Sequence, residues 1–448
     1  MKKHIISSSL FLCMGTAVFA QNITLLQAKE NTTNHNNTIK KSTLEIEEAN
    51  ALIKEARTGY LPKVSALAFG MKAIDPLIKL DMEGGNLPVY DGNPANLGSA
   101  TQFAYMPGIN ISALNQLAGA AVTAMQPVYA GNRIKTGNKL ADLNLEVKEK
   151  QKELSQREVI LKTENEYWQT VKLYEKEGTL KAYEDFLDKL SKEVANAVKN
   201  GVTIKNDLLK VQVKRSELKL KRTQLENGTI LSTKQLCQTM GIPYTSDLIP
   251  IDRVTRISPP DTYFISDDQA LSQRIEYTLL EKSIEASKLQ TELKKGEGRP
   301  SVNVGISGFY MDPLTKSMDG SFNGMVFAGV SVPVSNWWED KHKINQMKAK
   351  EKIAENELKD NSSLLSLQIE KAWRDLNEAY KSISLNEEIL EQAIENRRVN
   401  QQSYKNGLSQ MSDLLEAQAQ VNDTEERLIE SKVTYQIAVA HYLMVTGR

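Results

Sequence analysis

Cysteine is nearly absent from this sequence. The 448 residues include only Cys13 and Cys237, and Cys13 lies in an apolar run at the N-terminus. The one remaining cysteine cannot form an internal disulfide, so stability has to come from packing or assembly. Histidine is also rare after that run, and His35, His342 and His441 are widely scattered. The sequence therefore predicts no metal site, and it indicates no other cofactor.

Three further absences narrow the class of protein. The 56 basic and 56 acidic residues balance, so no basic excess exists to attract nucleic acid. Beyond residue 20 no apolar run reaches about 18 residues, so we expect no helix that spans a membrane. Glycine-rich phosphate loops, paired Cys or His ligand spacings and nucleophile elbows are missing as well, which argues against an enzyme.

The first twenty residues resemble a secretory signal. Two lysines follow Met1, an apolar run extends from Ile5 to Phe19, and the small residue Ala20 comes next. This order is typical of a signal peptide, which we assign to residues 1–20. Lipid attachment at Cys13 is the minor alternative, because Leu12 stands where a lipoprotein signal would need a small residue.

Proline and aromatic residues are scarce, at 13 residues and 6%. After Pro127 no proline occurs up to Lys199, and after Pro333 none occurs up to Lys405. Each stretch of about 73 residues would be roughly 110 Å long as a helix, at 1.5 Å per residue. Apolar residues recur in the first stretch at helical spacing, as in Leu140, Leu143, Val147 and Leu154. Helices of this length predict coiled-coil packing.

The strongest feature is an internal repeat. Leu61-Pro62-Lys63-Val64 returns as Arg299-Pro300-Ser301-Val302, and Asn200-Gly201 returns as Asn406-Gly407. The offset is 206 residues from Pro127 to Gly241 and 238 at Pro62, so the first copy has 32 extra residues between 70 and 122. We therefore divide the chain into a first repeat at 21–241, a linker at 242–264 and a second repeat at 265–448.

Each repeat is predicted to form a helix, two strands, a very long helix, a tight turn and a return helix. The Asn-Gly pairs are natural left-handed ends for the long helices. Thr203 or Ser409 is placed to cap the following helix, with Asp207 or Asp413 in its first turn. The composition of segment 31–37 disfavours a helix there. The shorter helices are expected at about 38–59, 204–240, 268–295 and 410–446.

The strands of the second copy alternate cleanly between two faces. One face carries Val302, Val304, Ile306 and Tyr310, while Ser301, Asn303 and Ser307 lie opposite. The partner strand places Val326, Ala328, Val330 and Val332 on one side. In the first copy, Leu67 and Phe69 interrupt the polar face, and the second strand lies near 109–125. Residues 75–107 are expected to be a long outer loop.

Four strands cannot close a barrel alone, because the smallest membrane barrels need about eight and open edges are not tolerated in lipid. Two chains would give eight strands and a filled interior, whereas three would give twelve and leave a lumen. A trimer is favoured. The alternative is a pair of surface hairpins on a soluble protein.

Several prolines and aromatic residues mark the boundaries between strands and helices. The aromatic residues suit a membrane–water interface, or equally an apolar seam between barrel and helices. The predicted boundary residues are Pro62, Pro127, Tyr129, Pro300, Pro333, Trp337 and Trp338.

Taken together, these motifs resemble the TolC-like outer-membrane efflux proteins over nearly all of the chain after residue 20. The resemblance is carried by Leu61-Pro62, the segment 125–131 (MQPVYAG), and Tyr404-Lys405-Asn406-Gly407-Leu408-Ser409 with Asp413-Leu414-Leu415. Two details differ. The family's Asn-Pro break in the first helix is missing at 31–34, and Trp337-Trp338-Glu339-Asp340 replaces its usual glycine-containing turn.

The resemblance implies an α+β membrane protein, a homotrimeric duct with a shared 12-stranded barrel in outer-membrane lipid and coiled-coil helices in the periplasm. It would serve as the exit channel of a tripartite efflux or type I secretion system, with a periplasmic adaptor and an inner-membrane pump as partners. The expected adaptor contacts at the tip are Gly201, Val202, Thr203, Gly407, Leu408 and Ser409.

Several alternatives stay open at this point. The tip residues could form a plain helical turn, and Asp207 and Asp413 could form a charged gate ring or only cap helices. The chain as a whole could instead be a periplasmic adaptor, which normally has one hairpin and compact β domains, or a structural coiled coil without a pore.

Overall fold

The computed structural model describes residues 22–448 apart from 114, 256 and 316–318, so the predicted signal peptide lies outside the described residues. The chain forms two compact units. The helix unit comprises the residues up to 50, 143–285 and 351–448, and the strand unit comprises 51–142 and 286–350. Each unit takes segments from both predicted repeats, and the division into repeats stays a prediction.

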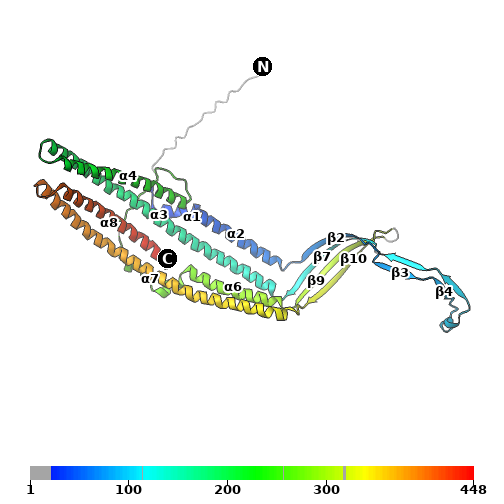
Figure 1. Cartoon of the computed structure of the whole chain (residues 1–448). Helices are drawn as coiled ribbons and strands as arrows, with labels where there is room; N and C mark the ends of the chain where they lie inside the picture. The colour runs from blue at the N-terminus through cyan, green and yellow to red at the C-terminus, as the bar shows by residue number, and fades with distance from the viewer. Residues whose placement is uncertain (1–21, 114, 256, 316–318) are drawn as a thin grey trace, which may run out of the picture. The chain divides into compact units, whose positions relative to one another are not determined.

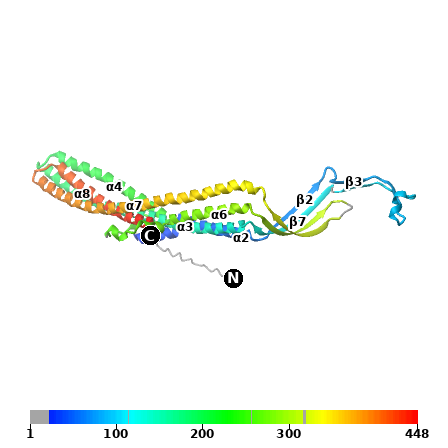
Figure 2. The same cartoon turned by 90° about the horizontal axis from the view of Figure 1, so that it is seen from below.

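Two pairs of long helices dominate the helix unit. In Figures 1 and 2, α4 (Lys205–Met240) turns back along α3 (Arg133–Lys199), and α8 (Met411–Val445) turns back along α7 (Asn336–Lys405). The helices α3 and α7 have 67 and 70 residues, and the helices α4 and α8 have 36 and 35. The predicted long helices and return helices are confirmed.

The shorter elements complete the order. They are β1 (Asn22–Ile23), α1 (Leu25–His35), α2 (Asn37–Thr58), β8 (Ile249–Pro250), η2 (Pro260–Tyr263), α5 (Asp267–Ser272) and α6 (Ile275–Glu297). Strands β1 and β8 pair in parallel, so part of the predicted linker is held against the start of the first repeat.

The polar segment 31–37 corrects one expectation, because α1 includes Asn31–His35 and only Asn36 leaves the helical conformation. Asn36 Nδ2 donates to Thr239 O at 2.7 Å, and Asn36 Oδ1 accepts from Thr38 N at 2.7 Å. The Asn36 side chain therefore satisfies a backbone carbonyl at the end of α4 and caps the start of α2. The chain thus breaks between α1 and α2 at an asparagine that no proline follows.

The strand unit contains a four-stranded antiparallel sheet in the order β10-β9-β7-β2 (Figure 1). Its strands are β2 (Lys63–Lys72), β7 (Gln116–Ala130), β9 (Ser301–Asp312) and β10 (Ser321–Ser331). Pro127 lies inside β7, at a shift of register between Pro127 and Tyr129. The long helix therefore begins at Arg133 and not after Pro127, because a bulge tolerates proline in a strand.

The register confirms the predicted faces. Val64 lies opposite Ala124, Ala124 opposite Ile306, and Ile306 opposite Val326, which makes one apolar row across all four strands. On the other face Thr123 and Ser307 share a hydrogen bond of 2.9 Å between their hydroxyls. Phe69 and Phe327 also lie on this face. Each covers a neighbouring glycine, Gly119 or Gly305, where a Cβ would come within 3 Å of the ring.

The expectation of a loop at 75–107 is corrected, because the segment contains three paired strands and a short helix. Strand β3 (Ile78–Met82) pairs with β6 (Ile109–Ala113), β4 (Gly85–Pro88) pairs with β5 (Phe103–Met106), and η1 (Pro94–Ser99) lies between β4 and β5. The period-two alternation at 78–82 matches that at 109–111, so the two segments form a ribbon.

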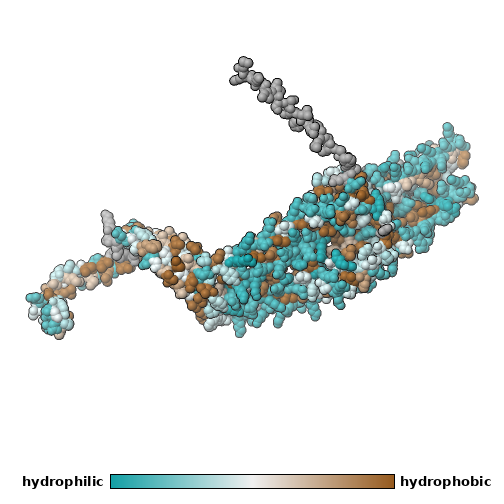
Figure 3. Space-filling model, turned by 180° about the vertical axis from the view of Figure 1, so that it is seen from behind, coloured by the Kyte–Doolittle hydropathy of each residue, from teal (hydrophilic) through white to brown (hydrophobic). Residues whose placement is uncertain are grey.

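The helix unit has dense cores, whereas the outer strands of the sheet are exposed on both faces. Tyr167, Leu187, Leu236 and Leu376 are fully buried among the helices. Every residue of β2 is exposed, and in β10 only Phe327 is partly covered. Figure 3 shows apolar side chains on the surface of the strand region. The sheet thus has no apolar core beneath it among the described residues.

Candidate functional site

The two helical turns have the same backbone geometry. Gly201 and Gly407 both have φ of +74°, a conformation that favours glycine. Val202 N donates to Ala197 O at 2.9 Å, and Leu408 N donates to Ser403 O at 2.8 Å. These bonds close the ends of α3 and α7 in the manner of a Schellman motif. The left-handed helix ends predicted from Asn-Gly are confirmed.

The predicted caps at Thr203 and Ser409 are wrong. Helices α4 and α8 begin one residue later than such caps require, with Ile204 and Gln410 at the capping positions. Thr203 Oγ1 donates to Asp207 Oδ2 at 2.7 Å, and Ser409 Oγ donates to Asn400 O at 3.4 Å. Each hydroxyl therefore forms a hydrogen bond at the turn and does not cap the helix that follows.

Asp207 and Asp413 lie in the first helical turns, as predicted, but their surroundings differ. The side chain of Asp207 is 15% exposed, with Lys210 Nζ at 4.0 Å. Burial, with the Asp207 carboxylate nearby, raises the pKa of the Tyr404 phenol at the end of α7. Asp413 is exposed, and its Oδ2 accepts from Gln410 N at 3.0 Å. The two carboxylates thus have local partners of different kinds.

Apolar side chains at the turns point into open space. Val202 is 79% exposed and Leu408 is 80% exposed, at equivalent positions of the two repeats. A Cβ at Gly201 or Gly407 would meet no atom within 4 Å. The tip therefore presents two exposed apolar side chains on tight turns.

Beneath the turns, three helices share one apolar core. It joins α3, α4 and α8 through Leu187, Val194, Val211, Leu218, Met411 and Leu414. Partly buried Leu208 and Tyr404 pack against it. Because one core joins the two hairpins, both turns lie on a single packed body.

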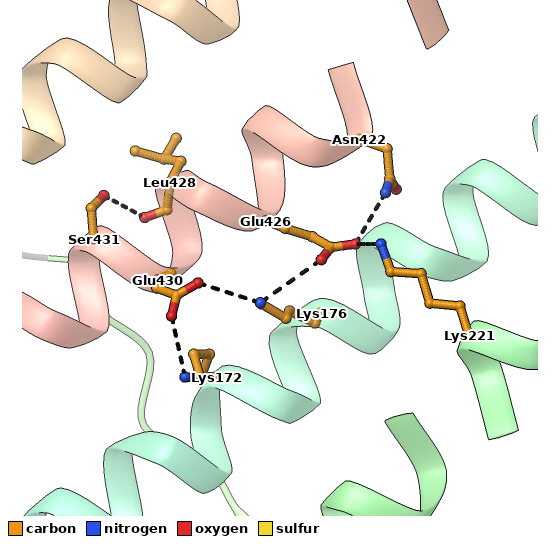
Figure 4. A network of polar contacts seen from close by, with 8 residues as sticks. All are labelled: Lys172, Lys176, Lys221, Asn422, Glu426, Leu428, Glu430 and Ser431. Carbon is orange, nitrogen blue, oxygen red and sulfur yellow. Dashed lines mark hydrogen bonds and ion pairs between the residues drawn. The ribbon is translucent and has the colours of Figure 1, made fainter. Parts of the chain in front are cut away.

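An ion-pair network joins the same three helices farther along (Figure 4). Glu426 of α8 lies 2.6 Å from Lys221 Nζ of α4 and 3.8 Å from Lys176 Nζ of α3. Glu430 lies 3.6 Å from both Lys172 Nζ and Lys176 Nζ. Sequence reasoning missed this network. Its only signal was the i,i+4 spacing of the two lysines and of the two glutamates.

The sheet has two open edges. Strands β2 and β10 are the outer strands, and the described residues provide no strand beyond them. Three antiparallel steps separate them, so β2 and β10 run in opposite directions. An edge of this kind is a template for pairing with another chain.

The predicted boundary residues lie at the ends of the strands, except for Pro127. Pro62 precedes β2, Pro300 precedes β9, and Pro333 follows β10. Tyr129 is 41% exposed at the end of β7, and Trp337 and Trp338 are about 60% exposed in the first turn of α7. Trp337 Nε1 donates to Gly298 O at 3.3 Å, which fixes one of the two indoles.

Two features are absent from the described residues. None of the helices there is both long enough and apolar enough to cross a membrane. Among the same residues, no cluster of three or more His, Cys, Asp or Glu side chains is placed to hold a metal ion.

Nearly the whole chain superposes on solved outer-membrane channels. The outer-membrane channel OprN is 14% identical with a TM-score of 0.74, covering 94% of this chain and 89% of that one. The Campylobacter jejuni CmeC outer membrane channel is 14% identical with a TM-score of 0.73, covering 94% and 85%. The outer membrane protein VceC from Vibrio cholerae is 13% identical with a TM-score of 0.70, covering 94% and 96%. The chain therefore has the fold of outer-membrane channel proteins.

The sequence gives a second, independent match. Residues 268–447 match the family described as outer membrane efflux protein. No curated protein matches the sequence significantly. The second half of the chain thus matches the sequence pattern of that family, within a chain that has the channel fold over 94% of its length. The resemblance inferred from the motifs is confirmed.

Proposed function

We propose that three copies of this chain form an outer-membrane duct, the passive exit channel of a tripartite efflux or type I secretion system. The observation that carries the proposal is the sheet of the strand unit. Its outer strands β2 and β10 are exposed on both faces, one face of the sheet is apolar, and its two edges are open among the described residues. Such a sheet is unfavourable in water, and it becomes satisfied in lipid once copies of the chain close the edges.

The strand geometry supports closure by several chains. Since β2 and β10 run in opposite directions, the β2 edge of one chain can pair antiparallel with the β10 edge of the next. Strands β2, β9 and β10 have 10, 12 and 11 residues, and a tilted membrane strand needs about 9–11. The face with Val64, Ala124, Ile306 and Val326 would contact lipid, and the face with Thr123 and Ser307 would line the lumen.

We further propose that the helices project into the periplasm and that the turns contact an adaptor protein bound to an inner-membrane pump. The support is the pair of exposed apolar side chains, Val202 and Leu408, at the ends of a packed body. Gly201, Thr203, Gly407 and Ser409 hold the turns that present them. The duct itself performs no chemical reaction in this proposal, and the pump supplies the energy.

A gate at the tip is part of the same proposal. Packed helices change state by sliding or rotating against one another. An opening that moves α8 away from α3 and α4 has to separate Glu426 and Glu430 from their lysines. These ion pairs would then favour the closed state.

The two competing functions fit the structure less well. A periplasmic adaptor has compact β domains, whereas the described residues place no apolar core beneath the sheet. A structural coiled coil without a pore does not account for four strands with one apolar face and open edges. Neither alternative explains the match to channels over 94% of the chain.

The central test uses the full-length protein extracted from outer membranes with detergent. We expect a trimer by light scattering and discrete conductance steps in planar lipid bilayers. A stable water-soluble monomer without conductance would refute the duct.

The tip is tested separately with Val202→Asp combined with Leu408→Asp. Both side chains are exposed, so trimer yield and conductance should be unchanged while export in cells falls at least tenfold. Val202→Ile combined with Leu408→Met keeps the apolar surface and is the matched control. Normal export by the aspartate variant would refute the proposed adaptor contact without contradicting the proposed duct.

A further inference from the structure

The β3–β6 ribbon separates apolar from polar side chains completely among its described residues. Leu80 pairs with Ile111 and Met82 pairs with Ile109, and these four share one face with Ile78. Lys79, Asp81 and Asn110 lie on the other face. The five apolar residues are 41–49% exposed, so the chain itself does not bury them.

Among the residues that the structure describes, the ribbon occurs only in the first repeat. In the second repeat β9 ends at Asp312 and β10 begins at Ser321, with a short connection between them. In the first repeat the connection between β2 and β7 runs from 73 to 115 and contains the ribbon. The 32 extra residues of the first repeat thus lie in the connection that contains the ribbon, and they add a surface that the second repeat does not share among the described residues.

The ribbon lies beyond the length of sheet that a membrane needs. Strands β2, β9 and β10 already have 10–12 residues, enough to cross the hydrocarbon. The ribbon continues from the ends of β2 and β7 that are opposite to the helices α2 and α3. In the proposed duct it therefore stands outside the outer membrane, where lipid cannot cover its apolar face.

An isolated two-stranded ribbon is at best marginally stable in water, and an uncovered apolar face adds to the cost. A neighbouring copy of the same chain is the occupant that the fold supplies. Strand β3 follows β2, and β2 is the edge at which neighbouring chains join in the proposed duct. Bends at Ile74, Asp75 and Leu77 separate the two strands, so the ribbon need not follow the barrel wall.

We propose that the apolar ribbon faces of the three chains pack against one another and form a cap over the outer mouth of the duct. This inference rests on the proposed trimer. The residues in contact are Ile78, Leu80, Met82, Ile109 and Ile111, while Lys79, Asp81 and Asn110 face water. Export then requires the ribbons to part at the outer mouth, independently of any gate at the helical tip.

Cysteine cross-linking on intact cells tests the cap. Both native cysteines are replaced by alanine, and Leu80→Cys is compared with Asp81→Cys, its neighbour on the polar face. A short bis-maleimide should link Leu80→Cys chains into dimers at least ten times more than Asp81→Cys chains. The trimer is verified in the same samples with a lysine-reactive cross-linker.

Each other outcome overturns the cap. Equal linking of the two variants in intact trimers would show that the apolar faces do not meet. Modification of Leu80→Cys by a water-soluble maleimide alone would indicate an open ribbon, and modification only by a lipid-soluble maleimide would indicate burial in the bilayer. Linking to a foreign protein would identify another occupant. Absence of the trimer would refute the duct as well as the cap, which separates that failure from the others.

Discussion

The helix unit and the strand unit differ in where their apolar side chains are buried. In the helix unit Leu187 and Leu376 have no exposed surface, and three clusters of such residues hold the helices together. In the strand unit Phe322 is 77% exposed and Val326 is 86% exposed. One unit thus carries its own core, and the other has apolar surface that only lipid or other chains can cover.

This difference separates two sources of stability within one chain. Burying apolar surface contributes about 25 cal/mol per Å², and the helix unit obtains this contribution from intrachain packing. The sheet obtains it only after insertion and assembly, since its residues are accessible in the single chain. Substitutions in the two regions should therefore respond differently to the presence of a bilayer.

The largest effect is expected in the core of the helical tip. Leu187→Ala should lower the free energy of unfolding by about 2–5 kcal/mol, because it leaves a cavity among α3, α4 and α8. Leu220→Ala removes the same atoms from a side chain that is 61% exposed, and its loss should stay below about 1 kcal/mol. Denaturant titration in detergent, followed by circular dichroism, measures both. Equal losses would contradict the packing of the tip.

A slightly smaller effect is expected on the apolar face of the sheet, and it should depend on lipid. Val326→Arg should cost about 2–4 kcal/mol in a bilayer, the cost of arginine near the centre of the membrane on a lipid-facing strand. Met325→Arg places the same charge on the opposite face, where a lumen would hydrate it. Folding equilibria in liposomes compare the two variants. If both were tolerated equally, the assignment of the lipid face would be wrong.

The sequence predicted most of the helices and the faces of the sheet because those features depend on local periodicity and on glycine at left-handed turns. It did not predict that Pro127 lies in a strand, since the bulge that tolerates it depends on pairing with β9. The β3–β6 ribbon depends on register across a segment rich in glycine and proline.

The local sequence pattern also did not predict the contacts at the helical tip. The Glu426 network joins residues about 205 positions apart, so it follows from the packing of α4 against α8. Residue type favours Thr203 and Ser409 as caps, but residue type does not fix the exact start of a helix. The two aspartates were placed correctly, but their different surroundings depend on Lys210 and Tyr404.

The smallest effect on stability is expected at Asp207 and Asp413, which lie in the first turns of α4 and α8. Asp207→Asn and Asp413→Asn should each cost about 0.3–1 kcal/mol, because each removes a negative charge from the first turn of a helix. Since each carboxylate already has a local partner, the cation preference of the channel should be unchanged when both are replaced. Single-channel reversal potentials in a salt gradient measure that preference. A clear loss of cation preference in the double variant would show that the two aspartates act as a charged ring at the gate, and a loss confined to Asp413→Asn would assign that role to the more exposed carboxylate.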